Sequence, residues 1–170
     1  GDNPLDYDRH RGKRNIGRRT GMRKIITAAL ILLVCFGGIV AADNAEAKSN
    51  LVSYANALAQ KYGLKMIPGT AGKVYSINEG QFVEIKRTLQ GGVKYYILGT
   101  GDRYAKNVGV ALFDENSNLI DKDMSSGRDG IVSVQPRWTG TFYIQVYLHQ
   151  GSSGYASVGY LIMYDPRTAK

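Results

Sequence analysis

Two runs of alternating residue types lie near the C-terminus, separated by Gln150-Gly151-Ser152-Ser153-Gly154. Side chains on a strand point to alternate faces, so the first run predicts a half-buried β-strand. Its core-facing residues are Phe142, Ile144, Val146 and Leu148, and the opposite face carries Tyr143, Gln145, Tyr147 and His149. The Gly/Ser-rich break predicts that the two runs form a hairpin.

The pattern of the second run, from Tyr155 to Tyr164, does not determine which of its two faces points into the core, and two alternatives remain. One alternative buries Ala156, Val158, Tyr160 and Ile162, and the other buries Tyr155, Leu161 and Met163. Earlier strand-like runs are separated by turn-forming residues, and they cover 73–77, 81–89, 93–99, 107–113, 119–120 and 131–134. About eight strands in one domain predict an all-β fold, an antiparallel β-sandwich over residues 72–170.

One short helix is predicted before these strands, within a helix-and-linker segment over residues 48–71. Apolar residues recur at helical spacing between Ser49 and Gly63. Ser49 or Asn50 can cap its start, and Gly63 can end it in the left-handed conformation with Leu64 closing over the last turn. We expect the helix to pack on the edge or the end of the sandwich.

The segment 22–47 has the pattern of a secretory signal peptide. Met22-Arg23-Lys24 precedes an uncharged, largely apolar run over residues 25–42, and Ala45-Glu46-Ala47 forms a small-x-small cleavage motif. Cleavage is predicted after Ala47, with Ala42 as the second candidate position. The alternative is a retained membrane anchor, because about 18 apolar residues is the lower limit for spanning a bilayer. A secreted or periplasmic location in a bacterium follows from the signal-peptide interpretation.

Residues 1–21 are polar and basic and show no apolar periodicity, which predicts a disordered extension. Met22 stands where a signal peptide should start, so one hypothesis is that translation begins there. The alternative is a long basic region that belongs to the signal.

The formal charge of +8 is divided between two parts of the chain. Residues up to Lys24 carry +5, Asp43 and Glu46 contribute −2, and residues from Lys48 onwards carry +5 with no cluster of Lys or Arg. A mildly basic domain without such a cluster argues against a nucleic-acid partner. The single cysteine, Cys35, lies in the apolar run, so the segment after it holds no disulfide and no thiol nucleophile.

Four segments in the predicted sandwich share a pattern of strands and turns: Gly92–Ile97, Val108–Asp114, Asn118–Ile120 with Asp121 and Asp123, and Thr139–Val146. Through these segments, residues 81–164 resemble the bacterial pre-peptidase C-terminal domain family. The resemblance implies a jelly-roll-like accessory module of secreted enzymes, and relatives in the group bind calcium or collagen. The sequence departs from the pattern at Lys106-Asn107, where the family often has aspartates, and no catalytic domain accompanies it.

The polar stretch from Asp114 to Asp123 has two interpretations. A calcium site could use the oxygen ligands of Asp114, Asn116, Asn118, Asp121 and Asp123, joined by Asp102 and Asp129 from neighbouring loops. It is not an EF-hand, because Leu119 and Ser125 occupy the positions that require Gly and Glu. The alternative, which the sequence favours, is a β-turn built from residues that hydrogen-bond their own backbone. No other cofactor is predicted.

No residue set for catalysis is present, so we predict no enzymatic activity. His149 is the only histidine after His10, which excludes a Cys–His dyad or a His-rich zinc site after the signal segment. No Gly-x-Ser-x-Gly elbow occurs, and Gly151-Ser152-Ser153-Gly154 is better explained as a loop.

The aromatic side chains give the functional hypothesis. Exposed tyrosines offer apolar area with a polar tip, so Tyr143 and Tyr147 are candidate ligand-binding residues, together with Trp138. The alternatives are that the tyrosines are half-buried under the helix or a loop, and that Trp138 plugs one end of the sandwich. We expect an exported binding module for an extracellular or envelope protein or polysaccharide. A structural subunit that assembles through its strand edges is the alternative, and a hydrolase has no supporting residues. Contact with a membrane is expected only through an uncleaved signal segment.

Overall fold

The structure is a computed structural model, and it describes residues 44–70 and 72–169. Within these residues one helix over positions 44–62 precedes nine strands. The strands are β1 (Lys65–Met66), β2 (Lys73–Asn78), β3 (Phe82–Leu89), β4 (Tyr95–Gly101), β5 (Ala105–Asp114), β6 (Leu119–Asp123), β7 (Asp129–Val134), β8 (Gly140–Gly151) and β9 (Tyr155–Tyr164). The predicted all-β sandwich with one preceding helix is confirmed, and the two-residue β1 is an addition to it.

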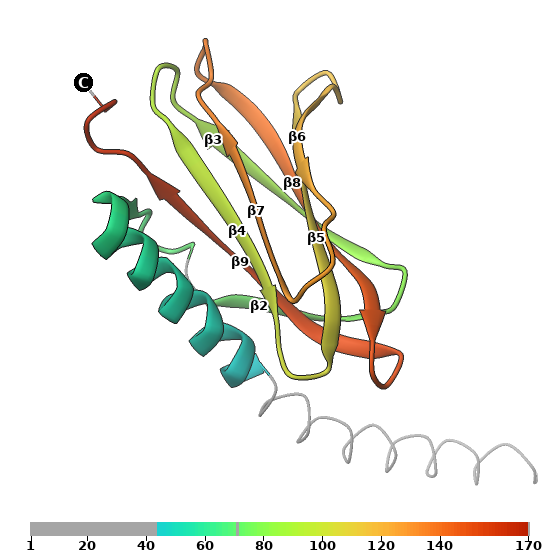
Figure 1. Ribbon diagram of the computed structural model, residues 1–170. Helices are drawn as coiled ribbons and strands as arrows, with labels where there is room; N and C mark the ends of the chain where they lie inside the picture. The colour runs from blue at the N-terminus through green and yellow to red at the C-terminus, as the bar shows by residue number, and fades with distance from the viewer. Residues whose placement is uncertain (1–43, 71, 170) are drawn as a thin grey trace, which may run out of the picture. The chain divides into compact units, whose positions relative to one another are not determined.

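The strands form two antiparallel sheets (Figure 1). Sheet A has the order β1-β9-β4-β7, with β2 also pairing with β9, and sheet B has the order β3-β8-β5-β6. Apolar residues from the facing sides of both sheets fill the space between them, among them Ile97, Val110 and Ile144. The predicted core face of β8 is confirmed, because Phe142, Ile144, Val146 and Leu148 are all buried there.

The prediction that the last two runs form a hairpin is wrong. β8 pairs with β3 and β5 in sheet B, whereas β9 pairs with β1, β2 and β4 in sheet A. The Gly/Ser-rich loop therefore crosses from one sheet to the other. The two strands differ because β8 has one apolar face and β9 has two, and a strand with two apolar faces needs cover on both sides.

Both faces of β9 are buried, so the first alternative is confirmed in full and the second for Leu161 and Met163, while Tyr155 is only partly buried. Val158, Tyr160 and their neighbours on one face lie in the core between the sheets. On the other face, Leu161 and Met163 pack under the helix against Leu51, in a second buried cluster. The helix therefore packs on the outer face of sheet A, and the expectation that it would lie on an edge or end is wrong (Figure 1).

The helix starts earlier than predicted and ends as predicted. It is already formed at position 44, so Ser49 and Asn50 lie inside it and do not cap it. The Asn50 amide instead donates to the Gly101 carbonyl at 3.1 Å, which fastens the helix to the end of β4. Gly63 has a φ of 70° and donates to the Ala59 carbonyl at 2.9 Å, and Leu64 is buried beside it. The predicted C-terminal cap is confirmed.

Most of the N-terminal predictions concern residues outside the described ones. These are the basic extension 1–21, the apolar run 25–42 with Cys35, and residues 22–43 of the predicted signal peptide. The described helix includes residues 44–47, and the position of cleavage stays a prediction. Within the described residues, no helix combines the length and the apolar character that crossing a bilayer requires.

Candidate binding face

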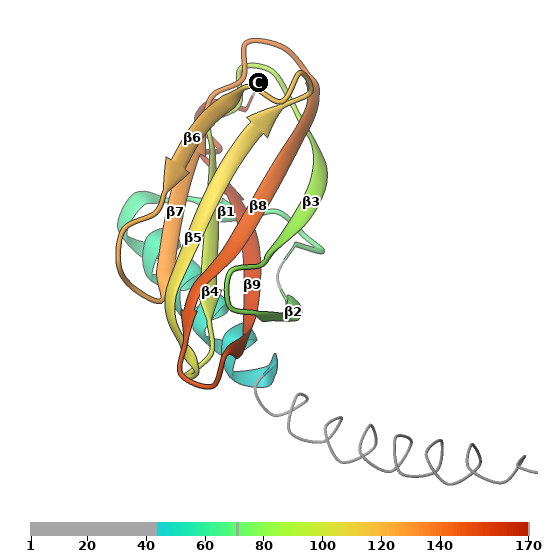
Figure 2. The ribbon, with the colours of Figure 1, turned by 90° about the vertical axis from the view of Figure 1, so that its right-hand side faces the viewer.

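The outer face of sheet B is the candidate binding face, and we call it the open face. Figure 2 looks onto this sheet, with β6, β5, β8 and β3 side by side and no described element in front of them. Tyr143 and Tyr147 project from β8 onto it and are partly exposed. Because the helix covers sheet A, it does not cover these tyrosines. The structure thus leaves one sandwich face sealed and the other accessible.

An aromatic row occupies one end of the open face and consists of Phe82, Tyr147 and His149. The Phe82 and Tyr147 ring centroids are 5.0 Å apart, and the Tyr147 and His149 rings stack at 5.5 Å with an interplanar angle of 3°. Phe82 is 47% exposed, so the row presents apolar area to solvent. Such rings can stack on a sugar or on an extended peptide.

Met124 extends the aromatic row beyond His149. Its sulfur lies 3.2 Å from His149 Nε2, and both atoms lie directly over Gly109 of β5. A Cβ atom at position 109 would come within 2.6 Å of His149 Nε2, so the glycine lets the imidazole and the Met124 sulfur lie close to the β5 backbone. Both side chains are exposed, which adds a polarisable surface to the row.

A chain of hydrogen bonds runs across the open face from β8 to β3. The Tyr147 hydroxyl donates to Gln145 Oε1, and Gln145 Nε2 donates to Glu84 Oε2 at 2.8 Å. Burial raises the pKa of Tyr147, and the negative charge of Glu84 raises it further. The phenol therefore stays protonated at neutral pH and keeps its hydrogen-bond donor.

A cavity of about 370 Å³ lies at the other end of the open face. Its lining consists of Glu84, Phe113, Glu115, Ser117, Tyr143 and Gln145. Two carboxylates beside two aromatic rings suit a ligand group that donates hydrogen bonds or carries positive charge. This cavity and the aromatic row are both reached from the open face, and Gln145 and Glu84 lie between them.

Trp138 lies next to this cavity, because it contacts Glu115, one of the residues that line it. Its indole Nε1–H donates to Glu115 Oε1 at 2.9 Å, and its ring lies 6.1 Å from that of the buried Phe142. Trp138 thus covers one end of the sandwich core while 43% of it stays exposed. The structure places Tyr143 and Trp138 near the same cavity and Tyr147 in the aromatic row.

The aspartates of the predicted calcium site have partners within the protein. Asp114 Oδ1 accepts from the backbone N–H groups of Asn116 and Asn118 at 2.9 and 2.8 Å, and Oδ2 accepts from Asn118 Nδ2 at 2.9 Å. The Asn118 amide, helped by these backbone groups, lowers the pKa of Asp114 below its usual value. This geometry is that of a turn that hydrogen-bonds its own backbone.

Asp121 and Asp123 cap the edge of the neighbouring sheet. Asp123 Oδ2 accepts from the Ile131 N–H at 3.0 Å, and Asp121 Oδ2 accepts from the Ser133 N–H at 2.8 Å. Both donors belong to β7, the last strand of sheet A. The Ser125 hydroxyl, followed by the Ile131 and Ser125 backbone N–H groups, lowers the pKa of Asp123. These carboxylates accept hydrogen bonds from backbone N–H groups with which another strand could otherwise pair.

Addition of calcium is expected to leave the melting temperature unchanged, because these carboxylates already accept hydrogen bonds. Within the described ranges, no group of three or more His, Cys, Asp or Glu side chains is placed to hold a metal ion. The calcium site and the turn stay alternative interpretations of these residues, and differential scanning calorimetry with Ca²⁺ or with a chelator distinguishes them. A stabilisation by Ca²⁺ that the Asp114→Asn variant loses would establish the site.

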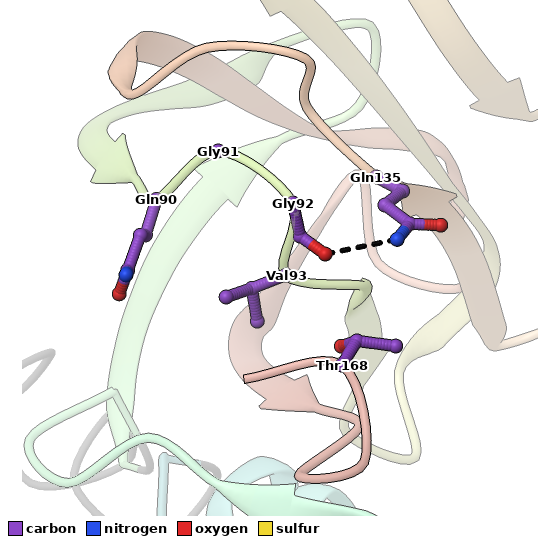
Figure 3. Close-up of a pocket in the computed structure, with 6 residues that line it drawn as sticks. All are labelled: Gln90, Gly91, Gly92, Val93, Gln135 and Thr168. Carbon is purple, nitrogen blue, oxygen red and sulfur yellow. Dashed lines mark hydrogen bonds between the residues drawn. The ribbon is translucent and has the colours of Figure 1, made fainter. Parts of the chain in front are cut away.

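Two further cavities lie away from the open face. One, of about 370 Å³, lies beside the β3–β4 loop, where Gln135 Nε2 donates to the Gly92 carbonyl at 2.8 Å (Figure 3). Its lining carries no charged side chain. The second, of about 330 Å³, is a groove between the helix and sheet A, lined by Tyr54, Leu58, Tyr62, Leu64, Tyr96 and Ile131. We call it the helix groove.

Sequence reasoning missed several residues of the open face. Phe82 and Glu84 alternate with the core residues Val83 and Ile85, so the pattern already placed them on the outer side of β3. Their proximity to Tyr147 and Gln145 depends on the register of β3 with β8. Met124 follows β6 in a polar stretch, where no periodicity marks it.

No family model and no curated protein matches the chain. Among solved structures, it is similar to PliG, a periplasmic lysozyme inhibitor of g-type lysozyme from Aeromonas hydrophila. That similarity has 12% identity and a TM-score of 0.42, and it covers 60% of this chain and 86% of that chain. It is also similar to the pre-peptidase C-terminal domain of a collagenase from Bacillus anthracis, with 13% identity, a TM-score of 0.41, and coverage of 53% of this chain and 87% of that one. Both are loose similarities of fold.

Proposed function

We propose that the chain is an exported, non-catalytic β-sandwich module that recognises a protein or a polysaccharide at the cell envelope. The single observation that carries the proposal is the asymmetry of the sandwich. The helix seals sheet A, while sheet B presents an aromatic row and a carboxylate-lined cavity on one uncovered face. Export rests on the predicted signal peptide.

The polar groups of the open face support binding rather than catalysis. His149 stacks on Tyr147 and contacts the Met124 sulfur, which leaves it without a nucleophile or carboxylate partner among the contacts of the described residues. Glu84 and Glu115 accept hydrogen bonds from Gln145 and the Trp138 indole. These groups are arranged to hold rings and donors in place, as in a recognition surface.

Replacing Tyr143 and Tyr147 together by alanine is expected to reduce binding at least about tenfold, because interfacial tyrosines often each contribute more than 1 kcal/mol. The measurement is cosedimentation of the purified protein with a bacterial envelope fraction that contains membranes and peptidoglycan. The melting temperature should fall by only a few degrees, since both rings are partly exposed.

Tyr62→Ala is the matched control, because Tyr62 is an exposed tyrosine of the helix groove. It should leave cosedimentation unchanged. Unchanged binding by the double variant would refute the open face as the binding surface. A collapse of its melting temperature would mean that the two rings belong to the core.

A second candidate function, an assembly subunit of the envelope, is favoured by one observation. The backbone groups along the outer edge of β3 have no partners among the described residues, and its charged residues Glu84 and Lys86 are spaced so that they can pair with those of a second copy.

A further inference from the structure

We propose that two copies of this chain pair through the outer edges of their β3 strands and form one continuous eight-stranded sheet from their two B sheets. β3 is an edge strand that pairs with β8 on one side only. Pairing through this edge does not depend on which ligand the open face binds.

The backbone of β3 presents four residues with unused hydrogen-bonding groups. Leu148 N–H donates to the Gln81 carbonyl, so residue 81 turns its backbone toward β8. In an antiparallel pair this orientation alternates, and Phe82, Glu84, Lys86 and Thr88 therefore direct their N–H and C=O groups away from β8. Among the described residues, none donates to or accepts from the backbone of these four. Their side chains are also exposed.

The edge strand on the opposite side of the molecule, β7, already has acceptors for its outward N–H groups. On β7, the outward N–H groups of Ile131 and Ser133 already donate to Asp123 and Asp121. A strand approaching β7 would have to displace these carboxylates. A strand approaching β3 meets backbone groups on alternate residues, from Phe82 to Thr88, that have no partner among the described residues.

The side chains of β3 select one register for a second copy. Only even-numbered residues carry free groups, so they must face one another across the two-fold axis. When the axis passes between Ile85 of one copy and Ile85 of the other, Glu84 faces Lys86 of the second copy, Phe82 faces Thr88, and both pairs occur twice. The smallest possible shift of the register is two residues. In one direction it places Glu84 against Glu84 of the second copy, and in the other direction it places Lys86 against Lys86. Opposite charges directly across a pair of strands stabilise it and like charges destabilise it.

Lys86 also makes the edge selective. A lysine in the middle of an edge strand disfavours pairing with an arbitrary strand. A second copy supplies an acidic residue at the facing position, so the charge that deters other partners favours this one. A two-fold axis normal to the sheet keeps the two open faces on the same side, which doubles the surface available to an extended ligand.

Sedimentation velocity of the full chain in a non-ionic detergent, over a hundredfold range of protein concentration, tests the proposal. We expect a concentration-dependent dimer. Glu84→Lys and Lys86→Glu should each weaken it roughly tenfold or more, because each reversal replaces two attractive pairs by two repulsive ones. The double variant E84K/K86E restores both pairs and should restore the dimer.

Two further variants separate the edge from other causes of association. Lys122→Glu reverses an exposed charge on β6, away from this edge, and should leave the dimer intact. Thr88→Pro removes an N–H group that has no partner among the described residues, so it should weaken the dimer while the far-ultraviolet circular dichroism stays that of the native fold. A monomer at every concentration would overturn the proposal. A dimer that survives both single reversals, or one that the double variant fails to restore, would do the same.

Discussion

Replacing Leu51 by alanine is expected to lower the free energy of unfolding by about 3 kcal/mol. Leu51 is fully buried and packs in the cluster that joins the helix to Leu98, Leu161 and Met163 of sheet A. Truncation removes its transfer free energy and leaves a cavity between two rigid elements, which can close only in part. Urea denaturation followed by circular dichroism measures the change.

Gln60→Ala is the control for this prediction, because Gln60 lies on the exposed side of the same helix. Its effect should stay within about 0.5 kcal/mol. If Leu51→Ala cost no more than Gln60→Ala, the helix would not be part of the folded unit, and sheet A would not be sealed. The distinction between a sealed and an open face would then be lost.

Replacing Asp102 by alanine is expected to cost about 3 kcal/mol, although its side chain is short and acidic. Asp102 is fully buried. Its Oδ1 accepts from the N–H groups of Tyr104 and Ala105 at 3.0 and 3.2 Å, and its Oδ2 accepts from the Ser157 N–H at 3.2 Å. The carboxylate thus ties the β4–β5 turn to β9, and its removal leaves the N–H groups of Tyr104 and Ser157 without these acceptors, while the Ala105 N–H keeps the Asp102 carbonyl at 3.1 Å.

Asp102→Asn separates the hydrogen bonds from the packing. The asparagine amide has the same shape as the carboxylate and keeps one acceptor oxygen. The Asp102→Asn variant should therefore lose clearly less stability than the Asp102→Ala variant. Equal losses for the two variants would show that the negative charge, rather than the number of acceptors, is what the turn requires. Thermal unfolding of all three proteins at one pH gives the comparison.

The alternation of residue types predicted the faces of strands well and their partners poorly. It placed Phe142 and Ile144 in the core and Tyr143 and Tyr147 on the opposite side, as the structure confirms. It could not show that β8 and β9 belong to different sheets, because alternation reports which side of a strand is apolar and not which strand lies beside it. The two apolar faces of β9 were the available signal, since they require cover by both sheet B and the helix.

The candidate site was predictable to the same extent. Tyr143 and Tyr147 followed from period-two spacing, but the aromatic row also needs Phe82, which lies more than sixty positions earlier and meets Tyr147 through the β3–β8 register. The aspartates show the converse problem. Oxygen-rich residues such as Asp121 suit both a cation and a free backbone N–H, and only the position of β7 distinguishes the two uses.

Hydroxyl-radical footprinting of the full chain, with and without the envelope fraction that it cosediments with, is the most direct test of the open face as the binding surface. Radicals oxidise aromatic and sulfur-containing side chains, and exposed side chains of these kinds lie both on the open face and in the helix groove. The predicted result is protection of Phe82, Met124 and Tyr147 on the open face, while Tyr62 in the helix groove keeps its reactivity. Protection of Tyr62 with unchanged oxidation of Phe82, Met124 and Tyr147 would contradict it.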